Sequence, residues 1–188
     1  MMVQYEVMFA GFGGQGIMTA GQLLAYAGIA EGKQVAWIPS YGPEMRGGTA
    51  YCTVVISDNR IGSPIVTTPT AVCVFNRPSF DKFEPRVKPH GLFIVNSSLI
   101  NVASRRSDIT QLLIPANDLA MKAGSAKAAN MAVLGAFIGS SGLVKYETVQ
   151  SVIREKMGKK EDLLNINFTV LEAGYQLALA SVGERQTT

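Results

Sequence analysis

The chain has 188 residues, which predicts a single domain over residues 1–188 with its core between about residue 5 and residue 180. Hydrophobic residues make up 47% of the sequence and charged residues only 16%, so either the core is generous or a partner covers part of the surface. The net charge of +3 is too small to indicate nucleic-acid binding.

Several other classes of protein are excluded by what the sequence lacks. No run of about 18 apolar residues predicts a membrane span, and the N-terminus has neither the positive start nor the cleavage site of a signal peptide. Two cysteines, Cys52 and Cys73, and one histidine, His90, cannot supply an iron–sulfur cluster or a zinc site. Both cysteines lie in apolar patterns, so we expect buried thiols in a cytoplasmic protein that binds no metal by itself.

The first third of the chain predicts strands around one helix. An apolar run from residue 5 ends in glycines, which is typical of a strand followed by a tight turn. Residues 17–31 predict a helix with small residues for close packing, and Gly32 is expected to end it. A strand at 34–39 is followed by a loop and by an alternating strand at 49–57.

The middle of the chain predicts three more strands, and the last third is helical. Strands are expected at 70–76, 91–98 and 109–117, with a short helical turn between the first two. A turn at 118–123 then leads to helices at about 126–139, 146–157 and 161–182, the last with a break expected, if anywhere, near 165–167. Strands that alternate with helices predict a three-layer α/β domain with a mostly parallel sheet, and the direct strand-to-strand steps allow one or two antiparallel members.

The first glycine-rich loop matches G-x-G-x-x-G and lies between the first strand and the first helix. Glycine allows left-handed turns and close backbone approach, and a helix N-terminus attracts an anion. The alternative is a tight crossover that binds nothing. The candidate binding residues of this loop are Gly11, Gly13, Gly14, Gln15 and Gly16.

A nicotinamide dinucleotide site needs more than this loop. It places an acidic residue about 20 residues further on, at the end of the second strand, to bind the ribose. That strand ends at Pro39 without a carboxylate or an arginine, and Glu31 comes too early. A dinucleotide-dependent dehydrogenase is therefore disfavoured.

The loop "SYGPEMRGG", residues 40–48, carries more charge than a turn needs. In a doubly wound sheet ligands bind beyond the carboxyl ends of the strands, and both loops follow such ends. We predict that Arg46 binds a phosphate or carboxylate, that Glu44 orients it, and that the two glycines leave clearance. The alternative is an internal Glu44–Arg46 ion pair. The candidates here are Ser40, Tyr41, Glu44, Arg46, Gly47 and Gly48.

Two asparagines are weaker candidates, and no catalytic group is predicted. Asn96 ends a strand, where it either caps the next turn or reaches the same edge of the sheet. Asn130 opens an apolar helix and is expected to be a buried packing amide. No Ser/His/Asp or Cys/His arrangement and no pair of carboxylates can be assembled from the sequence.

Four segments between about residues 5 and 180 are similar, in the same order, to gamma subunits of 2-oxoacid:ferredoxin oxidoreductases. These segments are "FGGQGI", "WIPSYGPEMRGG", "KPHGLFIVNSSLI" and "NMAVLGA". The resemblance implies a Rossmann-like domain in an enzyme that converts a 2-oxoacid and CoA to acyl-CoA and CO2 and passes two electrons to ferredoxin. One departure is Pro69-Thr70, where many members carry an acidic residue.

The resemblance also implies a shared active site. Thiamine diphosphate, magnesium and [4Fe-4S] clusters would belong to partner subunits named alpha, beta and delta, the isolated chain would be inactive, and CoA would be a substrate. We place the CoA phosphates on Arg46 and the backbone of Gly13–Gly16 as a hypothesis, and the "SYGPEMRGG" form favours 2-oxoglutarate as the 2-oxoacid. A free-standing dinucleotide oxidoreductase and a purely structural subunit are the alternatives.

Overall fold

The computed structural model describes residues 4–41, 49–158 and 160–185. Its centre is a six-stranded sheet with the order β2-β3-β1-β4-β5-β6. The strands are β1 (Gln4–Phe12), β2 (Gln34–Ser40), β3 (Thr49–Ser57), β4 (Ala71–Val74), β5 (Leu92–Asn96) and β6 (Thr110–Ile114).

The sheet is mixed, as the sequence predicts. Strands β1, β4, β5 and β6 pair in parallel, whereas β3 runs antiparallel to both of its neighbours, β1 and β2. Because β1 and β2 are both antiparallel to β3, these two strands run in the same direction. The prediction of a mostly parallel sheet with antiparallel members is confirmed.

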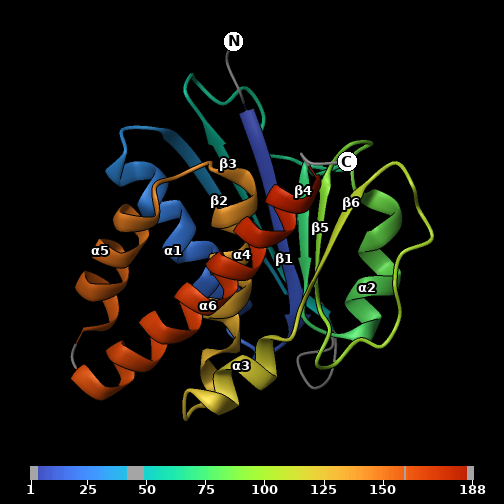
Figure 1. The fold of residues 1–188 in the computed structure, drawn as a ribbon. Helices are drawn as coiled ribbons and strands as arrows, with labels where there is room; N and C mark the ends of the chain where they lie inside the picture. Colours follow the sequence, from blue (N-terminus) through green and yellow to red (C-terminus); the bar gives the residue numbers. More distant parts are fainter. Residues whose placement is uncertain (1–3, 42–48, 159, 186–188) are drawn as a thin grey trace.

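Helices cover both faces of the sheet (Figure 1). The helices are α1 (Ile17–Ala30), α2 (Arg77–Phe83), α3 (Ala116–Lys122), α4 (Ala129–Ser141), α5 (Tyr146–Met157) and α6 (Glu161–Arg185), with short 3₁₀ turns η1 (Glu84–Arg86) and η2 (Ala126–Ala128). Side chains of β1 alternate between two cores: Val7 and Phe9 join the larger one with α1, α4 and α6, and Met8 joins the smaller one under α2.

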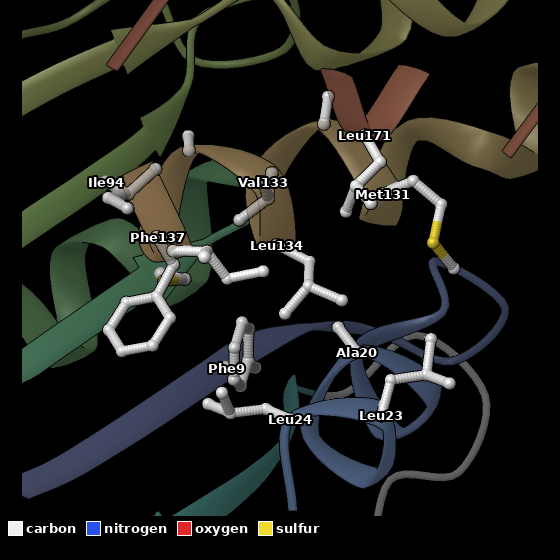
Figure 2. Close-up of a cluster of buried hydrophobic side chains, with 14 of the residues drawn as sticks. Phe9, Ala20, Leu23, Leu24, Ile94, Met131, Val133, Leu134, Phe137 and Leu171 are labelled. Atoms are coloured by element: carbon white, nitrogen blue, oxygen red, sulfur yellow. The ribbon is translucent and has the colours of Figure 1, made fainter. Parts of the chain in front are cut away.

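The larger core is built around the first strand. Figure 2 shows Phe9 between Leu24 of α1 and Leu134 and Phe137 of α4. The rings of Phe9 and Phe137 meet edge to face, with 6.2 Å between their centroids. All residues of α4 from Ala129 to Ile138 are buried, which explains why the sequence of this helix is apolar on nearly all sides.

Two sequence predictions differ from the structure. The strand expected at 109–117 ends at Ile114, because Pro115 has no N–H for the ladder and α3 begins directly after it. The break considered near 165–167 in the last helix is absent: α6 runs from Glu161 to Arg185. Packing against α4 outweighs the weak helix propensity of the two asparagines there.

Other expectations are confirmed. Gly32 ends α1 in the left-handed conformation, with φ of 74°. Both cysteines are free and buried, and burial raises the pKa of the Cys52 thiol to about 12 and that of Cys73 above its ordinary value. Within the described ranges, no helix combines the length and the apolar character that crossing a bilayer requires.

Candidate functional site

The strand directions bring four of the strand ends that matter here to one edge of the sheet. Phe12, Ser40 and Asn96 end β1, β2 and β5 there, and Thr49 begins β3 opposite Phe12. The two loops singled out in the sequence therefore leave the sheet at the same edge, as predicted. Tyr41 lies there with 63% of its surface exposed. Residues 42–48, which include the predicted Glu44, Arg46, Gly47 and Gly48, lie outside the described residues.

The glycine loop is a tight turn that opens α1. The Gln15 N–H donates to the Phe12 carbonyl oxygen at 3.2 Å, and Gly14 and Gly16 adopt left-handed φ angles of 90° and 75°. Gly14 is exposed and would have no neighbour within 4 Å of an added Cβ, so a ligand has room there. A Cβ on Gly11 would instead lie 2.7 Å from Gln15 Oε1, which makes Gly11 a packing residue.

The starts of two long helices meet beside this loop. No described side chain caps the first turn of α1, so its leading N–H groups keep the capacity to bind an anion, whereas at the start of α4 the Ala129 N–H already donates to the Ala126 carbonyl oxygen. Asn130, in the first turn of α4, is 4% exposed and donates from Nδ2 to the Gly16 carbonyl oxygen at 3.1 Å. The expected packing amide is thus buried, and it also ties α4 to the glycine loop.

A chain of side-chain amides runs along the same edge, and we call it the amide chain: Gln15, Asn76, Asn96 and Asn117. Gln15 accepts from Asn76 at 3.0 Å and donates to the Phe75 carbonyl oxygen at 3.3 Å. Asn96, which is fully buried, donates to Asn117 Oδ1 at 2.8 Å. Gln15 and Asn96, both predicted to bind a ligand, have their hydrogen bonds inside the protein, and their binding role stays a prediction.

A pocket of about 250 Å³ opens at the glycine loop. Its lining is Gly14, Gln15, Phe75, Asn117, Ala126, Lys127 and Ala129. Among the described residues of this lining, Lys127 is the single charged one and none is a carboxylate. The cavity combines one ammonium group, amides and two helix starts, which is an arrangement that suits a phosphate. Sequence reasoning did not identify Lys127, although a lysine just before an uncapped helix was a usable signal.

Within the described part of the chain, no group of His, Cys, Asp and Glu side chains has the geometry to hold a metal ion. His90 is exposed and precedes β5, so it lies at the opposite edge of the sheet from the pocket.

The model of a protein family described as "Pyruvate ferredoxin/flavodoxin oxidoreductase" matches residues 6–177 of the chain. The chain belongs to this family. The resemblance seen in the sequence is therefore confirmed at the level of the family, over the region that carries the sheet, the glycine loop and the pocket. The free-standing dinucleotide oxidoreductase considered as an alternative loses its basis.

Relatives in this family come in two lengths. The chain is 39% identical over 173 residues to ketoisovalerate oxidoreductase subunit VorA of Methanothermobacter marburgensis, covering 91% of this chain and 36% of the relative. It is 33% identical over 175 residues to 2-oxoglutarate synthase subunit KorC of Archaeoglobus fulgidus, covering 93% of this chain and 88% of the relative. The chain thus spans about a third of the VorA relative but most of the KorC relative.

Solved structures share the fold. The gamma subunit of a keto/oxoacid ferredoxin oxidoreductase from Geobacter sulfurreducens superposes with a TM-score of 0.82 at 29% identity, covering 94% of this chain and 99% of that one. A 2-oxoglutarate:ferredoxin oxidoreductase from Magnetococcus marinus, solved with 2-oxoglutarate, coenzyme A and succinyl-CoA bound, gives a TM-score of 0.87 at 25% identity, covering 94% of this chain and 31% of that one.

Proposed function

We propose that this chain is the gamma-type subunit of a 2-oxoacid:ferredoxin oxidoreductase complex. In the overall reaction a 2-oxoacid and CoA become acyl-CoA, CO2 and a proton, and two electrons pass to ferredoxin. The family match over residues 6–177 carries this proposal. Thiamine diphosphate, magnesium and [4Fe-4S] clusters belong to the alpha, beta and delta subunits, since the described residues of this chain offer no ligand set for a metal.

The role assigned to this chain is to bind the phosphate groups of CoA. Lys127 supplies a positive charge in the 250 Å³ pocket, and the start of α1 supplies N–H groups beside Gly14. Arg46, on the neighbouring loop that follows Ser40, is proposed to bind a second phosphate or the carboxylate of the substrate. The Magnetococcus marinus enzyme, of which this chain matches 31%, was solved with coenzyme A bound, which supports CoA as a ligand of the whole complex.

We propose 2-oxoglutarate as the 2-oxoacid, and 2-oxoisovalerate as the second candidate. The KorC relative supports the first, because it matches this chain over nearly all of its own length. The VorA relative supports the second through its higher identity of 39%. In the purified complex, CoA-dependent ferredoxin reduction is expected to show the highest kcat/KM with 2-oxoglutarate. A preference for 2-oxoisovalerate or pyruvate would overturn the substrate assignment, and no reduction with any 2-oxoacid would overturn the activity.

Helix α6 supplies the surface that we propose for docking on a partner subunit. It lies outermost on its face of the sheet, over α4 (Figure 1). Between Leu163 and Ser181 its only charged residue is Glu172, whereas an outer helix face is normally rich in charge. Leu163 and Leu177 lie on one stripe of this helix and are 47% and 40% exposed.

Introducing charge on this stripe is expected to release the chain from the complex. In a Leu163→Glu/Leu177→Glu double variant, two carboxylates would have to be buried at the interface without partners, which costs several kcal/mol. Size-exclusion chromatography of the co-expressed subunits should show the variant eluting free. Ile65→Glu is the matched control, since Ile65 is 81% exposed on the segment between β3 and β4. Equal retention of the double variant and the control would exclude α6 as the docking surface.

A further inference from the structure

The amide chain fixes the orientation of every amide in it. The backbone N–H of Ala116 donates to Asn96 at 3.2 Å, so the atom of Asn96 that accepts must be its oxygen. The amino group of Asn96 then faces the Phe75 carbonyl oxygen at 3.4 Å and Asn117 at 2.8 Å. An amino group can only donate, so the oxygen of Asn117 is the atom turned toward Asn96.

The same logic fixes the other end of the amide chain. The Ser79 N–H donates to Asn76 Oδ1 at 2.9 Å, so the amino group of Asn76 points at Gln15 and meets its oxygen at 3.0 Å. That oxygen also accepts from the Phe12 N–H at 2.7 Å. The Gln15 amino group donates to the Phe75 carbonyl oxygen at 3.3 Å, so one of its two N–H groups is committed inside the protein, and the Gln15 side chain holds the glycine loop.

Two amides of the chain, Gln15 and Asn117, line the pocket. Asn117 lines the cavity together with Lys127 and Gly14, and its oxygen is committed to Asn96. We infer that the Asn117 amino group donates a hydrogen bond to a phosphate of the bound ligand, and that Asn96 is the positioning residue that orients it. This rests on the proposed function in one respect only, which is that the phosphate belongs to CoA.

The orientation makes the pocket selective for anions. With the Asn117 oxygen turned away, the polar groups presented to the cavity by Asn117 and Lys127 are both donors. A phosphate oxygen accepts from such donors, whereas a cation or a second donor is repelled. Asn96 achieves this without a charge of its own, so it does not compete with the ligand.

Exchanging Asn117 for aspartate separates binding from structure. Asn117→Asp keeps an oxygen for the Asn96 amino group and the shape of the side chain, but it presents a carboxylate oxygen to the phosphate. In the intact complex we expect the KM for CoA to rise about tenfold or more, with the KM for the 2-oxoacid unchanged. Asn117→Ala, which deletes the donor without presenting a negative charge to the phosphate, should raise the KM for CoA about threefold.

Which of the two variants, Asn117→Asp or Asn117→Ala, raises the KM for CoA more distinguishes a binding role of Asn117 from a structural one. A purely structural role for Asn117 would make alanine worse than aspartate, because alanine leaves the Asn96 amino group without its partner, and that order would overturn the inference. Asn59→Asp, at an exposed asparagine after β3, is the charge-matched control and should leave both KM values unchanged. If Lys127→Gln raises the KM for CoA while Asn117→Asp does not, this inference fails and the proposed function stands; if neither variant changes it, the CoA assignment itself fails.

Discussion

Gly174→Val is expected to lower the free energy of unfolding by about 3 kcal/mol, the largest stability effect of a single substitution that we predict. A Cβ at Gly174 would overlap the carbonyl oxygen of Ala132 on α4 and would lie 2.7 Å from its carbonyl carbon. Gly135 on α4 is in the same position toward Leu171 and Tyr175 of α6. The two helices therefore meet backbone to backbone, and the obstructing atoms cannot rotate away as a flexible side chain would.

This loss should be measured by thermal or chemical unfolding of the chain. For a domain of this size, about 3 kcal/mol corresponds to a fall in Tm of roughly 9 °C. Gly62→Val is the control, because a Cβ there would have no neighbour within 4 Å, and its effect should stay within about 0.5 kcal/mol. If Gly174→Val unfolds at the temperature of the unsubstituted chain, the described contact between α4 and α6 is wrong.

The parts of the fold that follow from local pattern were predictable from the sequence. Apolar runs locate all six strands, and Gly32 correctly marks the end of the first helix. The short connection between the second and third strands indicates that these two strands run antiparallel. The resulting strand directions place the glycine loop and the loop after Ser40 at one edge of the sheet, and these two loops are the larger part of the candidate site.

Where prediction failed, distant contacts decided the outcome. Asn165 and Asn167 suggest a weak point in the last helix, yet Asn167 is buried against the rest of the fold and the helix continues. Asn96 was expected either to cap the turn that follows it or to reach this edge of the sheet. Its side-chain oxygen instead accepts from Ala116, 20 residues later, because β5 and β6 end side by side.

The remaining site residues needed the three-dimensional structure. Gln15 meets Asn76 across 61 positions of sequence, and Asn130 meets Gly16 across 114. Asn117 and Lys127 lie about 100 positions or more from the glycine loop in the sequence, and the fold brings both of them to it. A sequence pattern reports neighbours along the chain, whereas this pocket is assembled from the ends of separate strands and helices.

Substitution of Lys127 has the largest expected effect on function. Lys127→Gln removes the only charge that the described residues bring to the pocket lining, while keeping a side chain of similar length. A charge-assisted hydrogen bond contributes about 1.5–3 kcal/mol, so its loss should weaken CoA binding by about tenfold or more. The KM for the 2-oxoacid and the stability of the complex should not change, because Lys127 is exposed. Arg46→Ala is expected to raise the KM for CoA in the same way.

The KM for CoA of the assembled complex is therefore the most direct test of the account. It should be measured for the unsubstituted complex, for Lys127→Gln, and for Lys88→Gln, which removes an exposed lysine far from the pocket. The account predicts a KM for CoA about tenfold higher with Lys127→Gln and unchanged with Lys88→Gln. The same KM for CoA in all three complexes would contradict the assignment of the glycine-loop pocket as the CoA phosphate site.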